Sequence, residues 1–191
     1  LAAGDVAQAL TGDVVDGTSA TASLAFGNLH VGDAVTRHYQ VANTGTTGPA
    51  LRGAVQTSVN GGNLTDARLS GSGVTAGDFG PVDVATDSGD RAVTFTGSSA
   101  GALVDQRVAV VNNFDNVADQ VLSISGAVYR YANPGAHAPA PVDFGKRRVG
   151  DVVSQALTLS NDVPADGFSE ALDASIGGAT GAVTTNGGSI S

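Results

Sequence analysis

Apolar and polar side chains alternate with a period of two along most of the chain, which is the pattern of half-buried β-strands. The alternation is clearest at residues 93–96, 108–110 and 122–124, where Val, Phe, Leu or Ile alternates with Thr, Ala or Ser. Clusters of Gly, Asn, Asp and Ser separate these runs, as turns do. Helical periodicity is absent over any stretch of helical length. The pattern predicts an all-β fold, an antiparallel sandwich of seven or eight strands in about 110 residues.

An internal repeat sets the expected architecture. Residues 24–35 return as residues 142–153, an offset of 118 positions. Seven of the 20 positions from 24 to 43 are identical at that offset: Phe26, Gly27, Val31, Gly32, Asp33, Val35 and Asn43. The apolar alternation continues beyond them, since Tyr39 matches Leu157 and Val41 matches Leu159. Chance is a poor explanation, and the sequence predicts repeated modules in series.

Weaker echoes predict where the modules begin and end. Residues 10–14 resemble residues 124–128, the expected last strand of the complete module, and residues 1–5 resemble residues 74–78. A Pro-rich stretch, suited to a stiff spacer, follows the complete module. We therefore predict four segments: the C-terminal part of a preceding repeat at 1–17, a complete module at 20–131, a Pro-rich linker at 132–141, and the N-terminal half of a following repeat at 142–191.

The repeated motif Phe-Gly-x-x-x-Val-Gly-Asp, at residues 26–33 and 144–151, resembles bacterial modules of the choice-of-anchor D type. These modules are relatives of the ASPM/SPD-2/Hydin group, and the likeness extends to residues 165–180 and covers most of 20–191. It implies an immunoglobulin-like antiparallel β-sandwich in tandem repeats, in a bacterial secreted or surface-attached protein. One departure is Val163 in the second copy, where the first has the turn glycine Gly45. We expect each Phe to close one end of a sandwich and each following Gly to allow a bend.

Composition excludes several kinds of site. With no cysteine, the chain has no disulfide, thiolate zinc site or Cys nucleophile. Its 18 acidic residues against 9 basic ones give a formal charge of −9, and the only basic run is 146–148. Nucleic acid needs clustered Lys and Arg, so it is not an expected partner. No apolar run approaches the roughly 20 residues that span a bilayer, so no membrane insertion is expected. The resemblance to choice-of-anchor D modules, and not the composition, implies an extracellular or cell-surface location.

The sequence predicts no catalytic residues. Its three histidines, His30, His38 and His137, are scattered and have no Ser or Asp constellation around them. Nucleophilic catalysis needs a base beside the nucleophile. We therefore expect that the chain is not an enzyme.

Calcium is the one cofactor that the sequence raises. Four aspartates, Asp78, Asp83, Asp87 and Asp90, lie within 13 residues among Gly and Ser. Loop carboxylates and carbonyls are what Ca²⁺ binds, with six to eight oxygens. However, the spacing fits neither the EF-hand loop nor the nonapeptide repeat. Solvated turn aspartates are the competing interpretation, because Asp suits turns.

The leading functional hypothesis is a non-catalytic structural or adhesive module. The fragments at 1–15 and 142–191 suggest head-to-tail self-assembly by strand complementation between molecules. The expected partners are other copies or neighbouring repeats, with a host or surface glycan or protein as a further partner. Two alternatives stay open: a calcium- or glycan-binding module, and an appendage of a larger secreted enzyme.

Overall fold

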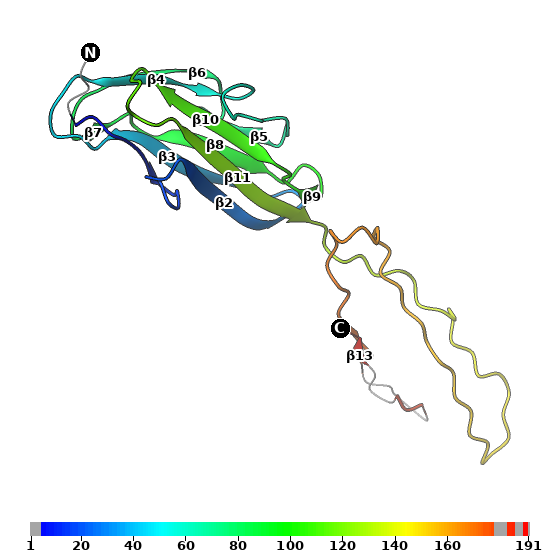
Figure 1. Ribbon diagram of the computed structural model, residues 1–191. Coiled ribbons are helices and arrows are strands. Elements are labelled where there is room, and N and C mark those ends of the chain that lie inside the picture. Colours follow the sequence, from blue (N-terminus) through cyan, green and yellow to red (C-terminus); the bar gives the residue numbers. More distant parts are fainter. Residues whose placement is uncertain (1–4, 178–182, 186–188, 191) are drawn as a thin grey trace. The chain divides into compact units, whose positions relative to one another are not determined.

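The computed structural model describes residues 5–177, 183–185 and 189–190. Among these residues every regular element is a β-strand and none is a helix, so the all-β prediction is confirmed (Figure 1). The chain divides into two units, residues 1–129 and 130–191. Eleven of the thirteen strands in the described part of the chain lie in the first unit. The second unit contains only β12 (Ala174–Ser175) and β13 (Ser189–Ile190), which pair antiparallel.

Two sheets form the first unit. One has the order β1-β3-β8-β5, with β7 also paired to β3, and all its pairs are antiparallel. Its strands are β1 (Gln8–Gly12), β3 (Ala34–Asn43), β5 (Leu69–Ser70), β7 (Thr86–Asp87) and β8 (Arg91–Thr96). The short β5 and β7 leave β3 and β8 as the main strands of this sheet.

The other sheet has the order β2-β11-β10-β4-β6, with β9 paired to β11. Its strands are β2 (Thr21–His30), β4 (Leu51–Gln56), β6 (Gly77–Val82), β9 (Gly101–Ala102), β10 (Gln106–Asn112) and β11 (Gln120–Tyr129). The β2–β11 pair is parallel and runs from Thr21 opposite Val121 to His30 opposite Tyr129, while the other pairs are antiparallel. The sheet is therefore mixed, and its parallel pair joins the beginning of the unit to its end.

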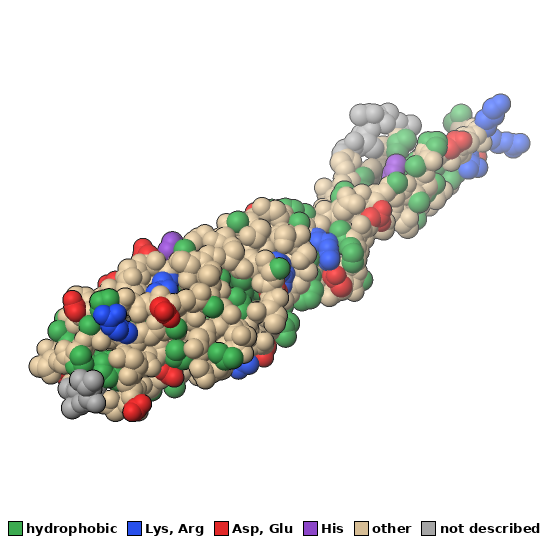
Figure 2. Space-filling view, turned by 90° about the horizontal axis from the view of Figure 1, so that it is seen from above, with side chains coloured by type: hydrophobic (Ala, Val, Ile, Leu, Met, Phe, Trp, Pro, Cys, Tyr) green, Lys and Arg blue, Asp and Glu red, His purple; other side chains and the backbone are tan. Residues whose placement is uncertain are grey.

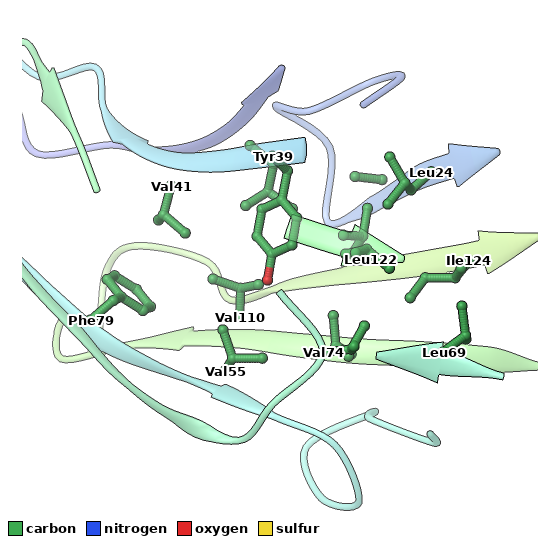
Figure 3. Close-up of a cluster of buried hydrophobic side chains, with 14 of the residues drawn as sticks. Leu24, Tyr39, Val41, Val55, Leu69, Val74, Phe79, Val110, Leu122 and Ile124 are labelled. Carbon is green, nitrogen blue, oxygen red and sulfur yellow. The ribbon is translucent and has the colours of Figure 1, made fainter. Parts of the chain in front are cut away.

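Apolar side chains from both sheets form one buried cluster between them, as a β-sandwich requires. Figure 3 shows Tyr39 and Val41 of one sheet facing Leu122, Val110 and other side chains of the second sheet. The Tyr39 ring is fully buried, and its hydroxyl donates a hydrogen bond of 2.8 Å to the Gly73 carbonyl. The alternating residues that the sequence marked as strand interiors are therefore the core of the first unit.

Residues 1–17, predicted as part of a preceding repeat, belong to the first unit in the structure. Strand β1 pairs along β3 from Gln8 opposite Asn43 to Gly12 opposite Tyr39. Leu10 is almost fully buried and belongs to the core cluster of this unit. The segment therefore completes this sandwich, and its origin in a preceding repeat stays a prediction.

The predicted linker 132–141 is also paired, within the second unit. Pro134 lies opposite Asn161 and Ala138 opposite Thr158, both antiparallel. The backbone N–H of Ala138 donates to the Thr158 carbonyl at 3.0 Å, and that of Thr158 returns the bond at 2.9 Å. The segment is therefore hydrogen-bonded within its own unit through isolated bridges, and its role as a linker stays a prediction.

Arg68 stabilises one end of the first unit. Its guanidinium contacts the Asp66 carboxylate at 2.7 Å and donates to three carbonyls between residues 99 and 102. It also lies over the Phe95 ring at 5.3 Å. The Arg68 guanidinium holds the pKa of the Asp66 carboxyl below its usual value. One side chain therefore ties the loop before β10 to the core.

Burial of Tyr39 predicts loss of stability in alkali. Burial raises its pKa from 10.0 to about 12, because the phenolate is poorly solvated there. A raised folded-state pKa contributes stability that is fully present below pH 10 and is lost as pH rises through about 12. We expect one of the three tyrosines to ionise only as the first unit unfolds, measured by tyrosinate absorbance together with circular dichroism. The Tyr39→Phe variant should lack this late phase. Three tyrosines ionising together in the folded protein would contradict it.

Candidate functional site

The four aspartates predicted as calcium ligands lie on different elements of the first unit. Asp78 is in β6 of one sheet, and Asp87 is in β7 of the other. Asp83 follows β6, and Asp90 precedes β8. All four are exposed. The structure therefore spreads them along one stretch of chain that passes from the second sheet to the first.

Three of these aspartates have local structural contacts. The Asp87 carboxylate accepts a bond from the Gly89 N–H at 2.8 Å, and the Asp90 carboxylate accepts one from the Gln40 amide at 2.7 Å. The Asp83 carbonyl accepts bonds from the N–H and hydroxyl of Thr86. Among the described residues, no three Asp, Glu, His or Cys side chains form a group that could hold a metal. The structure does not bring the four together, and calcium binding stays a prediction.

The three histidines belong to different elements, two in the first unit and one in the second. His30 ends β2, with its Nδ1 3.9 Å from an Asp33 carboxylate oxygen. His38 is exposed on β3 of the other sheet, and His137 belongs to the second unit. These positions provide no test of the prediction that the chain is not an enzyme.

The first copy of the repeated motif forms a bulge in β2. Ser125 of β11 lies opposite Ala25, whereas Ala127 lies opposite Asn28, so Phe26 and Gly27 together face a single residue of β11. Gly27 has φ +72°, a left-handed conformation that favours glycine. The bulge turns Phe26 into the core, as expected from the sequence, with its ring edge-on to Phe95 at 5.6 Å.

The motif ends in a tight turn from His30 to Asp33. The Asp33 N–H donates to the His30 carbonyl at 3.0 Å, and the Asp33 carboxylate accepts from the His30 N–H at 2.9 Å. Gly32, the third residue of the turn, has φ +100°. A positive φ at this position of a turn favours glycine, because other L residues rarely adopt this backbone conformation. Each residue of Val-Gly-Asp, identical in the two copies, therefore lies in or closes the turn.

The second copy of the motif has the same backbone. Gly145 has φ +61° and Gly150 has φ +97°. The Asp151 N–H donates to the Arg148 carbonyl at 3.1 Å, and the Asp151 carboxylate accepts from the Arg148 N–H at 3.0 Å. Both hydrogen bonds and both positive φ angles thus recur at the offset of 118 residues seen in the sequence.

The two copies differ in burial. Tyr39 and Val41 are fully buried, whereas their equivalents Leu157 and Leu159 are 40% and 37% exposed. We call the exposed equivalents of core residues in the second unit the open apolar set: Val142, Val153, Leu157 and Leu159. Figure 2 shows hydrophobic side chains reaching the surface of this unit. Exposed apolar groups of this kind mark interaction surfaces, so the open apolar set is the main candidate site.

An open pocket of about 190 Å³ in the first unit, lined by polar and apolar side chains, was not predicted from the sequence. Gln8 and Gln120 lie in its wall, both nearly fully buried. The Gln8 amide donates to the Val110 carbonyl at 3.0 Å and to the Gln120 side-chain oxygen at 3.2 Å. The Gln120 amide in turn donates to the carbonyls of Gly17 and Ser19. The only sign of this site in the sequence is an uncharged polar residue beside apolar strand positions. That pattern is too common in proteins to predict a pocket.

No protein-family model matches the chain, and no curated protein is similar to it. The described residues also include no helix with the length and apolar character needed to cross a bilayer. Conclusions about function therefore rest on the motif, the fold and the open apolar set.

The turn geometry predicts a specific effect of alanine at Gly32. Neither Gly32 nor Gly77 has an atom within 4 Å of the Cβ that alanine would add, but only Gly32 has a positive φ. We expect Gly32→Ala to lower the free energy of unfolding by about 1 kcal/mol through backbone strain. Gly77→Ala is the matched control and should change it little. Urea unfolding followed by circular dichroism measures both, and equal losses would show that the turn does not need glycine.

The glutamine pair predicts a larger effect at a buried site. Gln120→Leu removes three hydrogen bonds, one from the Gln8 amide and two to the carbonyls of Gly17 and Ser19, which should cost about 2 kcal/mol. Gln155→Leu, at an exposed position of the second unit, should stay within about 0.5 kcal/mol of the parent. Urea unfolding midpoints of the two variants provide the comparison. An unchanged midpoint in Gln120→Leu would mean that the amide network adds no stability.

Proposed function

We propose that this chain is a non-catalytic structural or adhesive segment of a tandem-repeat protein, located outside the cell or at its surface. The observation that carries the proposal is the motif Phe-Gly-x-x-x-Val-Gly-Asp, which has the same turn and the same positive-φ glycines in both copies. A conformation that recurs at a fixed offset is typical of repeat arrays. The resemblance to choice-of-anchor D modules supports the proposed location.

The strand order supports an immunoglobulin-like topology within this proposal. Such domains place strands A, B, E and D in one sheet and strands G, F, C and C′ in the other. The order β1-β3-β8-β5 corresponds to A-B-E-D, and β11-β10-β4 corresponds to G-F-C. Strand β6 lies beside β4 but follows β5 in the chain, whereas C′ precedes D, so β6 is an added strand at this position. Strand β2 is then an additional edge strand that lies parallel to the last strand. The first strand of this unit, β1, lies in one sheet and its last strand, β11, lies in the other. A module that begins and ends in different sheets suits a linear array.

The proposal places the start of the second repeat near residue 130. Gln8 pairs with Asn43 in the first unit, and Pro134 pairs with Asn161 in the second. Asn43 and Asn161 are equivalent positions of the repeat. The Pro-rich stretch therefore takes the place of β1 in the second repeat.

Neighbouring repeats or other copies are the proposed partners, and the structure bears on how they would associate. Strand β1 is hydrogen-bonded to β3, and Leu10 lies in the core. Donation of residues 1–15 to another molecule would require this strand to leave its own sheet. We therefore place any association by added strands in the second unit.

A structural spacer must resist tension, and the parallel β2–β11 pair is suited to this. Pulling β2 at its beginning and β11 at its end loads all their hydrogen bonds at once in shear, whereas pulling a hairpin open loads them one at a time. We expect a higher rupture force when the chain is held at Val15→Cys and Ala132→Cys than at Val104→Cys and Ala132→Cys. Because the protein has no cysteine, the attachment points are unique.

Single-molecule force spectroscopy on the full chain measures this difference. Val15 and Val104 are 59% and 73% exposed, so neither substitution removes a core side chain. Equal rupture forces in the two geometries would contradict a tension-bearing role for the module.

A further inference from the structure

Asn60 and Gly61 form a two-residue turn in the loop that follows β4 in the first unit. The Gly62 N–H donates to the Val59 carbonyl at 2.9 Å and closes the turn, while Asn60 and Gly61 have φ +52° and +96°. Positive φ at both central residues defines the type I′ turn that Asn-Gly favours. Both residues are exposed. Of the ten asparagines in the chain, two precede glycine, Asn60 and Asn186, and Asn186 lies outside the described residues.

The turn leaves the reactive groups of this Asn-Gly pair without backbone hydrogen bonds. Within the part of the chain that the structure describes, the Gly61 N–H has no hydrogen-bond acceptor. The Asn60 side-chain amide donates to the Gln56 side-chain oxygen at 2.6 Å, a contact between surface side chains. Glycine has no side chain to shield its nitrogen. The nitrogen of Gly61 can therefore approach the side-chain carbonyl carbon of Asn60.

Asn63, three residues later, has the opposite surroundings. Its N–H donates to the Arg107 carbonyl at 2.9 Å, and its side-chain amide donates to the Asp105 carbonyl at 2.8 Å. The nitrogen that would attack it, in Leu64, donates to the Thr57 carbonyl at 2.8 Å. The same reaction at Asn63 therefore requires local opening of the loop.

We propose that Asn60 is a site of spontaneous deamidation in the folded protein. The Gly61 nitrogen loses its proton to hydroxide and attacks the side-chain carbonyl carbon of Asn60. The new C–N bond closes a succinimide ring, the bond to the Asn60 amide nitrogen breaks, and ammonia leaves with a proton taken from water. Water then opens the ring at either carbonyl and yields aspartate or isoaspartate. The product carries one more negative charge than the formal −9 of the parent. The proposal does not depend on the proposed function.

The isoaspartate product does not fit the turn. It has one extra methylene in the main chain, but the turn is packed closely against β4 and β11. A Cβ at Gly62 would lie 2.5 Å from the Gln56 carbonyl oxygen, and one at Gly61 would lie 3.0 Å from a methyl group of Val121. Aspartate leaves the main chain unchanged and tolerates the positive φ. Isoaspartate should therefore loosen the loop, and aspartate should not.

The test incubates the full folded chain at mildly alkaline pH and follows the tryptic peptide 53–68 by mass spectrometry with fragmentation. This peptide contains both Asn60 and Asn63, so one digest compares the two sites. We expect deamidation at Asn60 to be faster by about tenfold or more, because Asn63 must wait for local opening. Mildly acidic pH should slow it, since the attacking nitrogen must lose a proton. Asn60→Gly accepts the positive φ and should remove the mass gain.

The products give a second readout. Enzymatic methylation of isoaspartate should detect a mixture of isoaspartate and aspartate at position 60, as opening of a ring requires. The isoaspartate form should exchange the Leu64 N–H faster than the Asn60→Asp variant, which has the same charge. Equal rates at Asn60 and Asn63, conversion of Asn60 only in urea, or aspartate as the sole product would each overturn the proposal. So would the same mass gain in Asn60→Gly.

Discussion

An amphipathic β-sheet is stable only when a second layer covers its apolar face, and this constraint governs both units of the chain. In the first unit two sheets bury Tyr39, Val41, Leu122 and Val110 against one another. In the second unit the corresponding strand residues, such as Leu157, lie partly in solvent. The difference does not come from poorer apolar residues, because the repeat preserves the alternation. It comes from the absence, among the described residues, of anything equivalent to β8, β10 and β11.

Glycine geometry brings the two sheets of the first unit into contact at Phe26. The bulge at Gly27 turns the ring toward Phe95, and Gly126 of β11 leaves the space that the two rings need. A Cβ at Gly126 would lie 3.0 Å from Phe95 and 3.1 Å from Phe26, tighter than most such contacts. Packing of Phe26 against Phe95 therefore depends on a glycine in the partner strand β11 as well as on the bulge at Gly27.

The sequence predicted the features that depend on local pattern. Alternation located the inward-facing residues of β3, β8, β10 and β11, and repeated Gly and Asp located the two turns. It did not predict that residues 8–12 belong to the first sandwich, because five residues with a buried Gln8 carry no clear period. The Gln8–Gln120 network and the contacts of Arg68 with distant carbonyls were also not predicted from the sequence. The first joins residues more than 100 positions apart and the second joins residues about 30 positions apart. The candidate aspartates were grouped by sequence distance, which the fold does not preserve.

The two copies of the motif separate what is encoded locally from what needs the whole sandwich. The turn closed by Asp33 and the one closed by Asp151 have the same hydrogen bonds, although only the first lies beside a complete core. The turn is therefore specified by its own residues, with glycine at the positive φ and an aspartate that accepts the backbone N–H. Burial is specified elsewhere, by strands that arrive later in the sequence. A turn that forms from its own residues also fixes the start of the strand that follows it, which lowers the ordering cost of pairing that strand.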